Sequence, residues 1–153
     1  MYRMDLNDTS FPKLLADYQL SGLKAVQDGI AISSNSWVPG PQLNQDTLNA
    51  YHAVSRYMAE AGRDGLGIVS LFAGGNNREE GMNANYDPTD NSPWAIIVAA
   101  SYQNGGLASY STPSASLLIS APGSGAGDDL TPYNSIVTTD RQSSDGYNTA
   151  SGT

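Results

Sequence analysis

The sequence has no cysteine, a single histidine and few basic residues. Without cysteine the chain cannot form a disulfide framework, a thiolate zinc site or a cysteine nucleophile. Its 7 lysines and arginines are outnumbered by 15 acidic residues, which gives a formal net charge of −8. Binding to a nucleic-acid backbone requires clustered positive charge, so this balance argues against a nucleic-acid partner.

Long apolar runs are also missing from the sequence. No run reaches the roughly 18 residues that a membrane-spanning helix requires. The first five residues do not carry a basic segment followed by an apolar core, as a signal peptide does. The sequence therefore predicts no membrane partner and no signal peptide. Its 153 residues fit about one domain.

Helical and strand patterns alternate along the chain. Two segments, 11–27 and 47–62, have apolar residues at helical spacing. Gly22 is predicted to interrupt the first helix, and Asp46 is predicted to cap the second. Strands are predicted at residues 30–37, 68–73, 94–100, 116–120 and 136–139. This alternation predicts an α/β fold with a mainly parallel sheet.

Short motifs follow these predicted strands in a specific order. They are Ser36-Trp37-Val38-Pro39, Phe72-Ala73-Gly74-Gly75-Asn76-Asn77, Asp87-Pro88-Thr89-Asp90-Asn91-Ser92, Ile119-Ser120-Ala121-Pro122-Gly123 and Ser151-Gly152-Thr153. Each motif is weak evidence alone, but their order is informative. Over roughly residues 29–153 the sequence resembles the subtilisin-like serine proteases, or subtilases, and is most similar to their kexin and proprotein-convertase branch.

The resemblance implies a three-layer subtilisin-like fold that is incomplete, with residues 1–153 forming part of a peptidase catalytic domain. In the family, a catalytic aspartate, histidine and serine hydrolyse peptide bonds through an acyl-enzyme. The family motifs that carry the aspartate and the histidine do not occur in the sequence, and the serine would follow Thr153. We therefore expect a fragment of a secreted serine endopeptidase that is inactive alone.

Asn76 is the residue on which the expected active site depends. Such a protease needs preformed donors for the oxyanion of its tetrahedral intermediate. On the residues alone, Asn76 and Asn77 fit a turn, whereas the resemblance assigns Asn76 to the oxyanion hole. Extended substrate would pair with the backbone of Ser36-Trp37-Val38 and of Ala73-Gly74-Gly75, at the two edges of a cleft. Val38 replaces a glycine of the family, so its side chain is expected to narrow the substrate channel.

Acidic residues in the convertase branch select basic substrate side chains and share a calcium site. Asp87 matches one of these acids and is therefore expected to bind substrate, although without the family it would only begin the turn before Pro88. The positions of the other acids hold Gly40-Pro41-Gln42 and Thr112, which argues against strict arginine specificity. Calcium is the one cofactor that the resemblance leaves open, and no metal ligand is assigned.

Two further candidates for chemistry have simpler interpretations. His52 lies on the predicted outer face of the second helix beside Arg56, so a solvated histidine is favoured over a general base. Asp128 and Asp129 fall in a Gly-rich stretch without regularly spaced acids, so a solvated loop is favoured over a calcium site.

Two alternatives to a protease fragment remain. The chain could reuse a subtilase-like fold as a non-catalytic binding module. An α/β hydrolase of another type has less support, because no Gly-x-Ser-x-Gly sequence occurs. A peptide or protein substrate is the expected partner of the parent enzyme. The isolated chain is expected to associate with itself or with the missing part of the catalytic domain.

Overall fold

The computed structural model describes residues 10–41, 44–124, 136–140 and 146–153. Its helices and strands are α1 (Phe11–Gln27), β1 (Ile32–Asn35), α2 (Gln45–Ala61), β2 (Val69–Ala73), β3 (Ala95–Tyr102), β4 (Leu117–Ser124), β5 (Ile136–Thr139) and β6 (Tyr147–Ala150). Short 3₁₀ helices lie at Gly62–Gly65, Arg78–Glu80 and Ala84–Tyr86.

Within these residues the main sheet has four strands in the order β1-β2-β3-β4, and every neighbouring pair is parallel. The predicted α/β fold with a mainly parallel sheet is confirmed. β4 continues to Ser124, beyond its predicted end at residue 120, so Pro122 and Gly123 lie within it. Strands β5 and β6 form a separate antiparallel pair. The sequence predicts β5 correctly but gives no sign of β6, whose residues Tyr-Asn-Thr-Ala are mostly polar.

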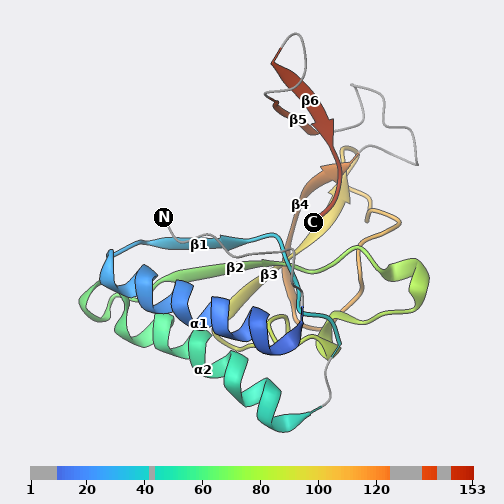
Figure 1. Ribbon diagram of the computed structural model, residues 1–153. Coiled ribbons are helices and arrows are strands. Elements are labelled where there is room, and N and C mark those ends of the chain that lie inside the picture. The colour runs from blue at the N-terminus through green and yellow to red at the C-terminus, as the bar shows by residue number, and fades with distance from the viewer. Residues whose placement is uncertain (1–9, 42–43, 125–135, 141–145) are drawn as a thin grey trace.

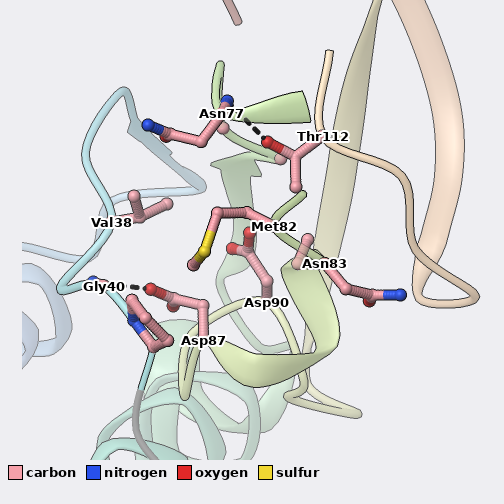
Figure 2. A pocket seen from close by; sticks show the side chains of 12 residues that line it. Val38, Gly40, Asn77, Met82, Asn83, Asp87, Asp90 and Thr112 are labelled. Atoms are coloured by element: carbon pink, nitrogen blue, oxygen red, sulfur yellow. Dashed lines mark hydrogen bonds between the residues drawn. The ribbon is translucent and has the colours of Figure 1, made fainter. Parts of the chain in front are cut away.

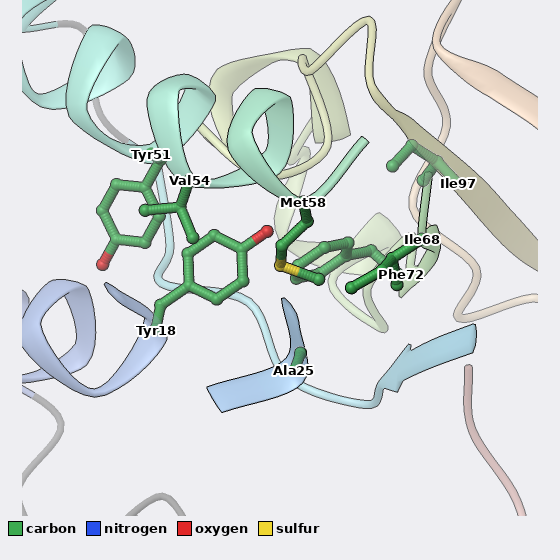
Figure 3. Close-up of a cluster of buried hydrophobic side chains, with 8 residues drawn as sticks. All are labelled: Tyr18, Ala25, Tyr51, Val54, Met58, Ile68, Phe72 and Ile97. Carbon is green, nitrogen blue, oxygen red and sulfur yellow. The ribbon is translucent and has the colours of Figure 1, made fainter. Parts of the chain in front are cut away.

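Both α-helices lie on the same face of the sheet (Figure 1). Between them and the sheet is the core shown in Figure 3, which is centred on Tyr18, Tyr51, Met58, Phe72 and Ile97. The ring of Tyr18 meets the rings of Tyr51 and Phe72 at centroid distances of 6.0 and 5.8 Å. Burying one such large apolar side chain contributes about 1.5–3 kcal/mol. This packing fixes the ends of β1 and β2, where the predicted site lies.

The predicted interruption of α1 at Gly22 is wrong, because α1 runs unbroken from Phe11 to Gln27. The glycine has a packing role instead. A Cβ atom at Gly22 would lie only 2.9 Å from Cγ1 of Val54 and 3.2 Å from Sδ of Met58, both on α2. Glycine therefore lets α1 and α2 approach closely at this point.

The predicted cap of α2 is wrong by two residues. The helix begins at Gln45, and Asn44 is its N-cap. The Oδ1 atom of Asn44 accepts hydrogen bonds from the backbone N–H groups of Asp46 and Thr47, at 2.9 and 3.2 Å. Asp46 lies instead in the first turn, where its charge complements the helix dipole.

The face of the sheet opposite the two α-helices carries exposed apolar side chains. Ile32 and Val69 are register partners on β1 and β2, and they are 62% and 43% exposed. On β2 only alternate residues, Ser70 and Phe72, are buried. Within the described residues, this sheet is therefore covered by α-helices on one face. Among the residues that the structure describes, none of the helices could span a lipid bilayer.

Candidate functional site

The predicted cleft lies at the carboxyl ends of β1 and β2. Parallel strands end at the same edge of a sheet, so the loops after β1 and β2 meet there, as in other open α/β sheets. A cavity of about 120 Å³ separates the two loops. It is lined by Ser36, Trp37, Val38, Ala73, Gly75, Asn76, Asn77 and Thr153.

A second cavity, of about 50 Å³, adjoins the cleft (Figure 2). It shares Val38, Gly75 and Asn77 with the cleft, and its other lining residues come mainly from the segment between β2 and β3. These other residues are Gly40, Pro41, Gly74, Met82, Asn83, Ala84, Asp87, Asp90 and Thr112. We call this second cavity the acidic pocket, after Asp87 and Asp90.

The structure brings the residues expected from the sequence together at one place. Six of the eight line the cleft, and the other two, Gly74 and Asp87, line the acidic pocket. Val38 lines both cavities, so its branched side chain occupies space that glycine would leave open. The ring of Trp37 also packs against Tyr18 and Phe72, so this residue joins the cleft to the core.

The glycines after β2 let the chain turn tightly into the cleft. Gly74 donates a 2.9 Å hydrogen bond to the carbonyl of Val98, which extends the pairing of β2 with β3. Gly75 has φ +88°, a conformation that L-residues rarely adopt. A Cβ atom there would also lie 3.0 Å from Oγ1 of Thr112. A glycine is therefore required at position 75.

Thr112 holds this turn in place, a role that the sequence analysis did not predict. Its backbone N–H donates to the carbonyl of Gly75 at 3.0 Å. Its Oγ1 atom accepts from the backbone N–H of Asn77 at 2.9 Å (Figure 2). These two bonds bracket Asn76, so the backbone on both sides of that residue is fixed.

The side chain of Asn76 projects toward the end of the described chain. Its Oδ1 atom accepts hydrogen bonds from the backbone N–H and the Oγ1 hydroxyl of Thr153, at 3.0 and 2.9 Å. Asn77 faces elsewhere, because its Nδ2 group donates to Glu80 at 3.0 Å. The two neighbouring asparagines both line the cleft but are committed to different partners, and the amide of Asn76 is the one that contacts Thr153 there.

Asp87 is held by the loop that follows β1. Its Oδ2 atom accepts a 2.8 Å hydrogen bond from the backbone N–H of Gly40, and its Oδ1 atom accepts from the N–H and hydroxyl of Thr89 at 2.9 and 2.6 Å. Burial raises the pKa of this carboxyl, and these hydrogen bonds act in the opposite direction. Asp87 thus both lines the acidic pocket and ties together two of its walls.

Asp90 is a second buried acid in the same pocket, and the sequence analysis did not single it out. Its side chain is 1% exposed, and burial followed by the charge of Asp87 raises its pKa to about 8. The Thr89 hydroxyl lies 3.3 Å from Asp90 but 2.6 Å from Asp87, and its one proton cannot serve both. The only sequence signal was a second acid three residues after Asp87.

His52 is not the solvated residue that the sequence predicted. Its side chain is half-buried against the ring of Trp94, at a centroid distance of 6.2 Å. Burial lowers its pKa, and a hydrogen bond with the backbone of Pro88 opposes that change. Because His52 lines neither the cleft nor the acidic pocket, the structure provides no support for a general base at this position.

Three residues from the sequence analysis lie outside the described residues, namely Gln42, Asp128 and Asp129. Within the described ranges, no three His, Cys, Asp or Glu side chains are placed so that they could hold a metal ion together.

Known proteins match this chain in sequence. Residues 2–153 match the model of the subtilase family. Proprotein convertase subtilisin/kexin type 7 of Mus musculus is 33% identical over 113 residues, which are 71% of this chain and 14% of that protein. The protein of the same name from Homo sapiens gives the same identity and coverage. The chain therefore spans only about a seventh of the length of these relatives.

Solved structures of proteases have the same fold. A lanthipeptide protease superposes with a TM-score of 0.75 at 16% identity, over 99% of this chain and 49% of its own. A cold-adapted subtilisin-like serine proteinase gives a TM-score of 0.65 at 17% identity, over 94% of this chain and 42% of its own. At these identities the likeness concerns the fold.

Proposed function

This chain belongs to the subtilase family, and we propose on that basis that its 153 residues form the oxyanion-hole and substrate-cleft part of a subtilisin-like serine endopeptidase. The observation that carries the proposal is the position of Asn76. It follows a strand of the parallel sheet, its backbone is bracketed by Thr112, and its amide lines a cleft between two loops. A preorganised amide donor in such a cleft can stabilise a developing oxyanion.

The proposed reaction is hydrolysis of a peptide bond through an acyl-enzyme. The substrate is an extended peptide that lies between the segment Ser36-Trp37-Val38 and the segment Ala73-Gly74-Gly75. Its carbonyl oxygen would approach Nδ2 of Asn76, and one of its side chains would enter the acidic pocket near Asp87. The similarity to proprotein convertases supports a secreted enzyme, which fractionation of the source cells tests.

We also propose that the 153 residues alone do not hydrolyse peptides. An oxyanion hole accelerates a reaction only when a nucleophile and a base act on the same carbonyl group. The family's motifs for the catalytic aspartate and histidine do not occur in the sequence, and His52 lines neither cavity. The remaining alternative is a non-catalytic module that binds peptides in the same cleft.

One experiment distinguishes a part of a peptidase from a non-catalytic peptide-binding module. The reading frame that encodes this chain is extended on both sides and searched for the family's Asp, His and Ser motifs. We expect the extended protein to react with a fluorophosphonate serine probe and to cleave a peptide library, whereas the 153-residue chain does neither. An extended protein that binds peptides but neither reacts with the probe nor cleaves them would establish the binding module instead.

A further inference from the structure

Asp87 and Asp90 form a buried pair of acids in the acidic pocket. Their side chains are 6% and 1% exposed, and Figure 2 shows both carboxyl groups among the side chains that surround this pocket. Within the described part of the chain, no lysine, arginine or histidine lines the pocket, and neither acid forms an ion pair. Two ionised carboxyl groups that share a buried site repel each other, so one of them retains a proton.

Hydrogen bonds decide which of the two acids holds that proton. Asp87 accepts from the backbone N–H of Gly40 at 2.8 Å and from the N–H and hydroxyl of Thr89 at 2.9 and 2.6 Å, and such donors stabilise the ionised form of a carboxyl group. Among the described residues, the one donor near Asp90 is the same Thr89 hydroxyl, at 3.3 Å, and its proton is engaged by Asp87. Asp90 is therefore the acid that stays protonated, in agreement with its pKa of about 8.

The neighbouring titratable groups keep a constant charge where Asp90 titrates. Tyr51 on α2 interacts with the charge of Asp87, and burial followed by that charge raises the pKa of Tyr51, so its hydroxyl stays neutral. His52 on α2 bonds to the backbone of Pro88, and burial lowers its pKa from 6.5, so it is neutral above about pH 7. The loop after β1, the turn after β2 and the segment before β4 contribute no charged lining residue. Among the described groups at this pocket, Asp90 alone changes its charge between about pH 7 and 9.

We propose that Asp90 is a specificity-determining residue that exchanges its proton for the positive charge of a substrate side chain. This inference rests on the proposed function, in which a peptide side chain enters the acidic pocket. While Asp90 keeps its proton, the pocket offers a neutral carboxyl group and a carboxylate that is already hydrogen-bonded, and it favours a neutral side chain. When the proton passes to solvent, a cation gains a second, unshared counter-charge at a buried site. Entry of a cation is therefore coupled to release of one proton, and it becomes more favourable as pH rises.

The size and the acid content of the pocket point to a compact organic cation. The cavity has a volume of only about 50 Å³, and the side chains of Val38 and Met82 contribute to its walls. An ammonium group is a compact point charge, whereas a guanidinium is planar and carries five donors in a fixed fork. A metal ion is disfavoured, because within the described ranges no third acid or histidine joins Asp87 and Asp90. The structure therefore favours a primary ammonium, as on lysine.

The first test follows the Asp90 carboxyl group in the 153-residue chain. The ¹³Cγ chemical shift of Asp90, assigned with the help of Asp90→Asn, is titrated between about pH 6 and 9.5 in methylammonium chloride and in an equal concentration of tetramethylammonium chloride. We expect methylammonium to move the midpoint to lower pH, because it binds the ionised form, whereas tetramethylammonium has the same charge but is too bulky for the pocket. Equal midpoints in the two salts, or a carboxyl group that is ionised throughout the range, would overturn the proposal whether or not the parent protein is a protease.

The second test uses the extended, active peptidase and two peptides that carry lysine or methionine at the position that enters the pocket. The ratio of their kcat/KM values cancels the titration of groups that act on both peptides alike. We expect the lysine-to-methionine ratio to rise by up to about tenfold between pH 7 and pH 9, because the ionised fraction of a group with a pKa of about 8 rises by that factor. In Asp90→Asn the ratio should not change with pH. Glu79→Gln, at an exposed acid of the same segment, is the matched control and should keep the rise.

The two tests separate this proposal from the proposed function. A ratio that does not change with pH in the unmodified peptidase would overturn the role of Asp90. So would a rise that persists in Asp90→Asn, since another group would then control the entry of the cation. An extended protein without any peptidase activity would contradict the proposed function instead, and the methylammonium titration of the 153-residue chain would still decide whether Asp90 exchanges its proton for a cation.

Discussion

The hydrogen-bond partners of two neighbouring asparagines determine which of them has an amide donor available in the cleft. Asn76 and Asn77 have the same chemistry and adjacent positions, so the sequence alone cannot separate them. In the structure the amide of Asn77 is engaged by Glu80, and its backbone N–H is engaged by Thr112. The amide of Asn76 lines the cleft and keeps its donor group unengaged within the described residues.

We expect Asn76→Ala to lower kcat of the extended peptidase by about 10²–10³-fold, a barrier increase of roughly 2.7–4 kcal/mol. KM should change little, because the amide meets the substrate oxygen fully only when that oxygen carries charge. Asn77→Ala is the matched control and should have a much smaller effect. Steady-state kinetics on one peptide substrate measure both. A sensitive Asn77 beside an indifferent Asn76 would mean that the assignment of this loop is wrong by one residue.

Asp90 should make the stability of the chain depend on pH. Its folded-state pKa is raised from 3.8 to about 8, so between these values the folded state holds a proton that the unfolded state has released. Stability is therefore present at low pH and is lost as pH rises toward 8, with a slope of up to about 1.4 kcal/mol per pH unit. Asp90→Asn keeps the shape without the charge, so we expect it to flatten this decline.

Urea unfolding of the 153-residue chain between pH 5 and 8 measures this effect. The free energy of unfolding of Asp90→Asn should exceed that of the unmodified chain at pH 8, and the difference should shrink toward pH 5. Glu79→Gln, at an exposed acid of the same segment, is the control. Titration of the half-buried His52 affects both proteins alike and cancels in the difference. Parallel pH profiles would contradict the assignment of a protonated Asp90.

At the scale of single elements, the sequence predicts most of the helices and strands, and the errors have physical causes. Gly22 has the low helix propensity that suggests a break, but the close approach of α2 overrides it. β6 has no apolar alternation, because its pairing with β5 depends on backbone hydrogen bonds more than on burial. The extension of β4 through Pro122 follows from its place at the sheet edge, where a missing N–H donor is tolerated.

The residues of the candidate site could also be predicted only in part from the sequence. The placement of Gly74, Gly75 and Asn76 beside the two cavities could be predicted, because a motif in one short segment carries them, and the oxyanion role of Asn76 stays a prediction. Thr112, Asp90 and Thr153 could not, because their roles depend on contacts with residues that are 77 or 35 positions away, or on burial that only the folded chain creates. Local sequence records which residues can do chemistry, and the fold decides which of them meet.

The N-cap of α2 gives a direct test of one such correction. We expect Asn44→Ala to lower the free energy of unfolding by about 1 kcal/mol, because two backbone N–H groups lose their acceptor. Asp46→Ala removes only the charge that complements the helix dipole, so it should cost less, about 0.3–0.5 kcal/mol. Urea unfolding of both variants measures the difference. If Asp46→Ala lowered the free energy of unfolding by more than Asn44→Ala, Asp46 would be the N-cap, as the sequence predicted.

At the scale of the whole molecule, the sheet is the incomplete part. Strands of parallel sheets are usually buried on both faces. Here both α-helices of the described chain lie on one face, and Ile32, Val69 and Ile119 are each between 43% and 62% exposed. Among the described strands β1 is also an edge strand, and no described strand pairs with one row of its backbone hydrogen-bonding groups. An exposed apolar face beside an open edge favours association.

We therefore expect the purified 153-residue chain to associate with itself. When it is dilute and monomeric, we expect it to have a low melting temperature. Burying one isoleucine side chain contributes about 1.5–3 kcal/mol. Covering several such residues in a shared interface would therefore offset much of the cost of association, which is about 4–15 kcal/mol. Sedimentation velocity over a range of concentrations should show an average mass that rises with concentration. Ile32→Lys places a charge on the uncovered face and should reduce that rise. Leu66→Lys changes an exposed leucine in the turn after α2 and should not. The expectation would be contradicted by a chain that stays monomeric at all concentrations and unfolds sharply above the usual mesophile range of roughly 45–65 °C. The exposed face of the sheet would then need no partner.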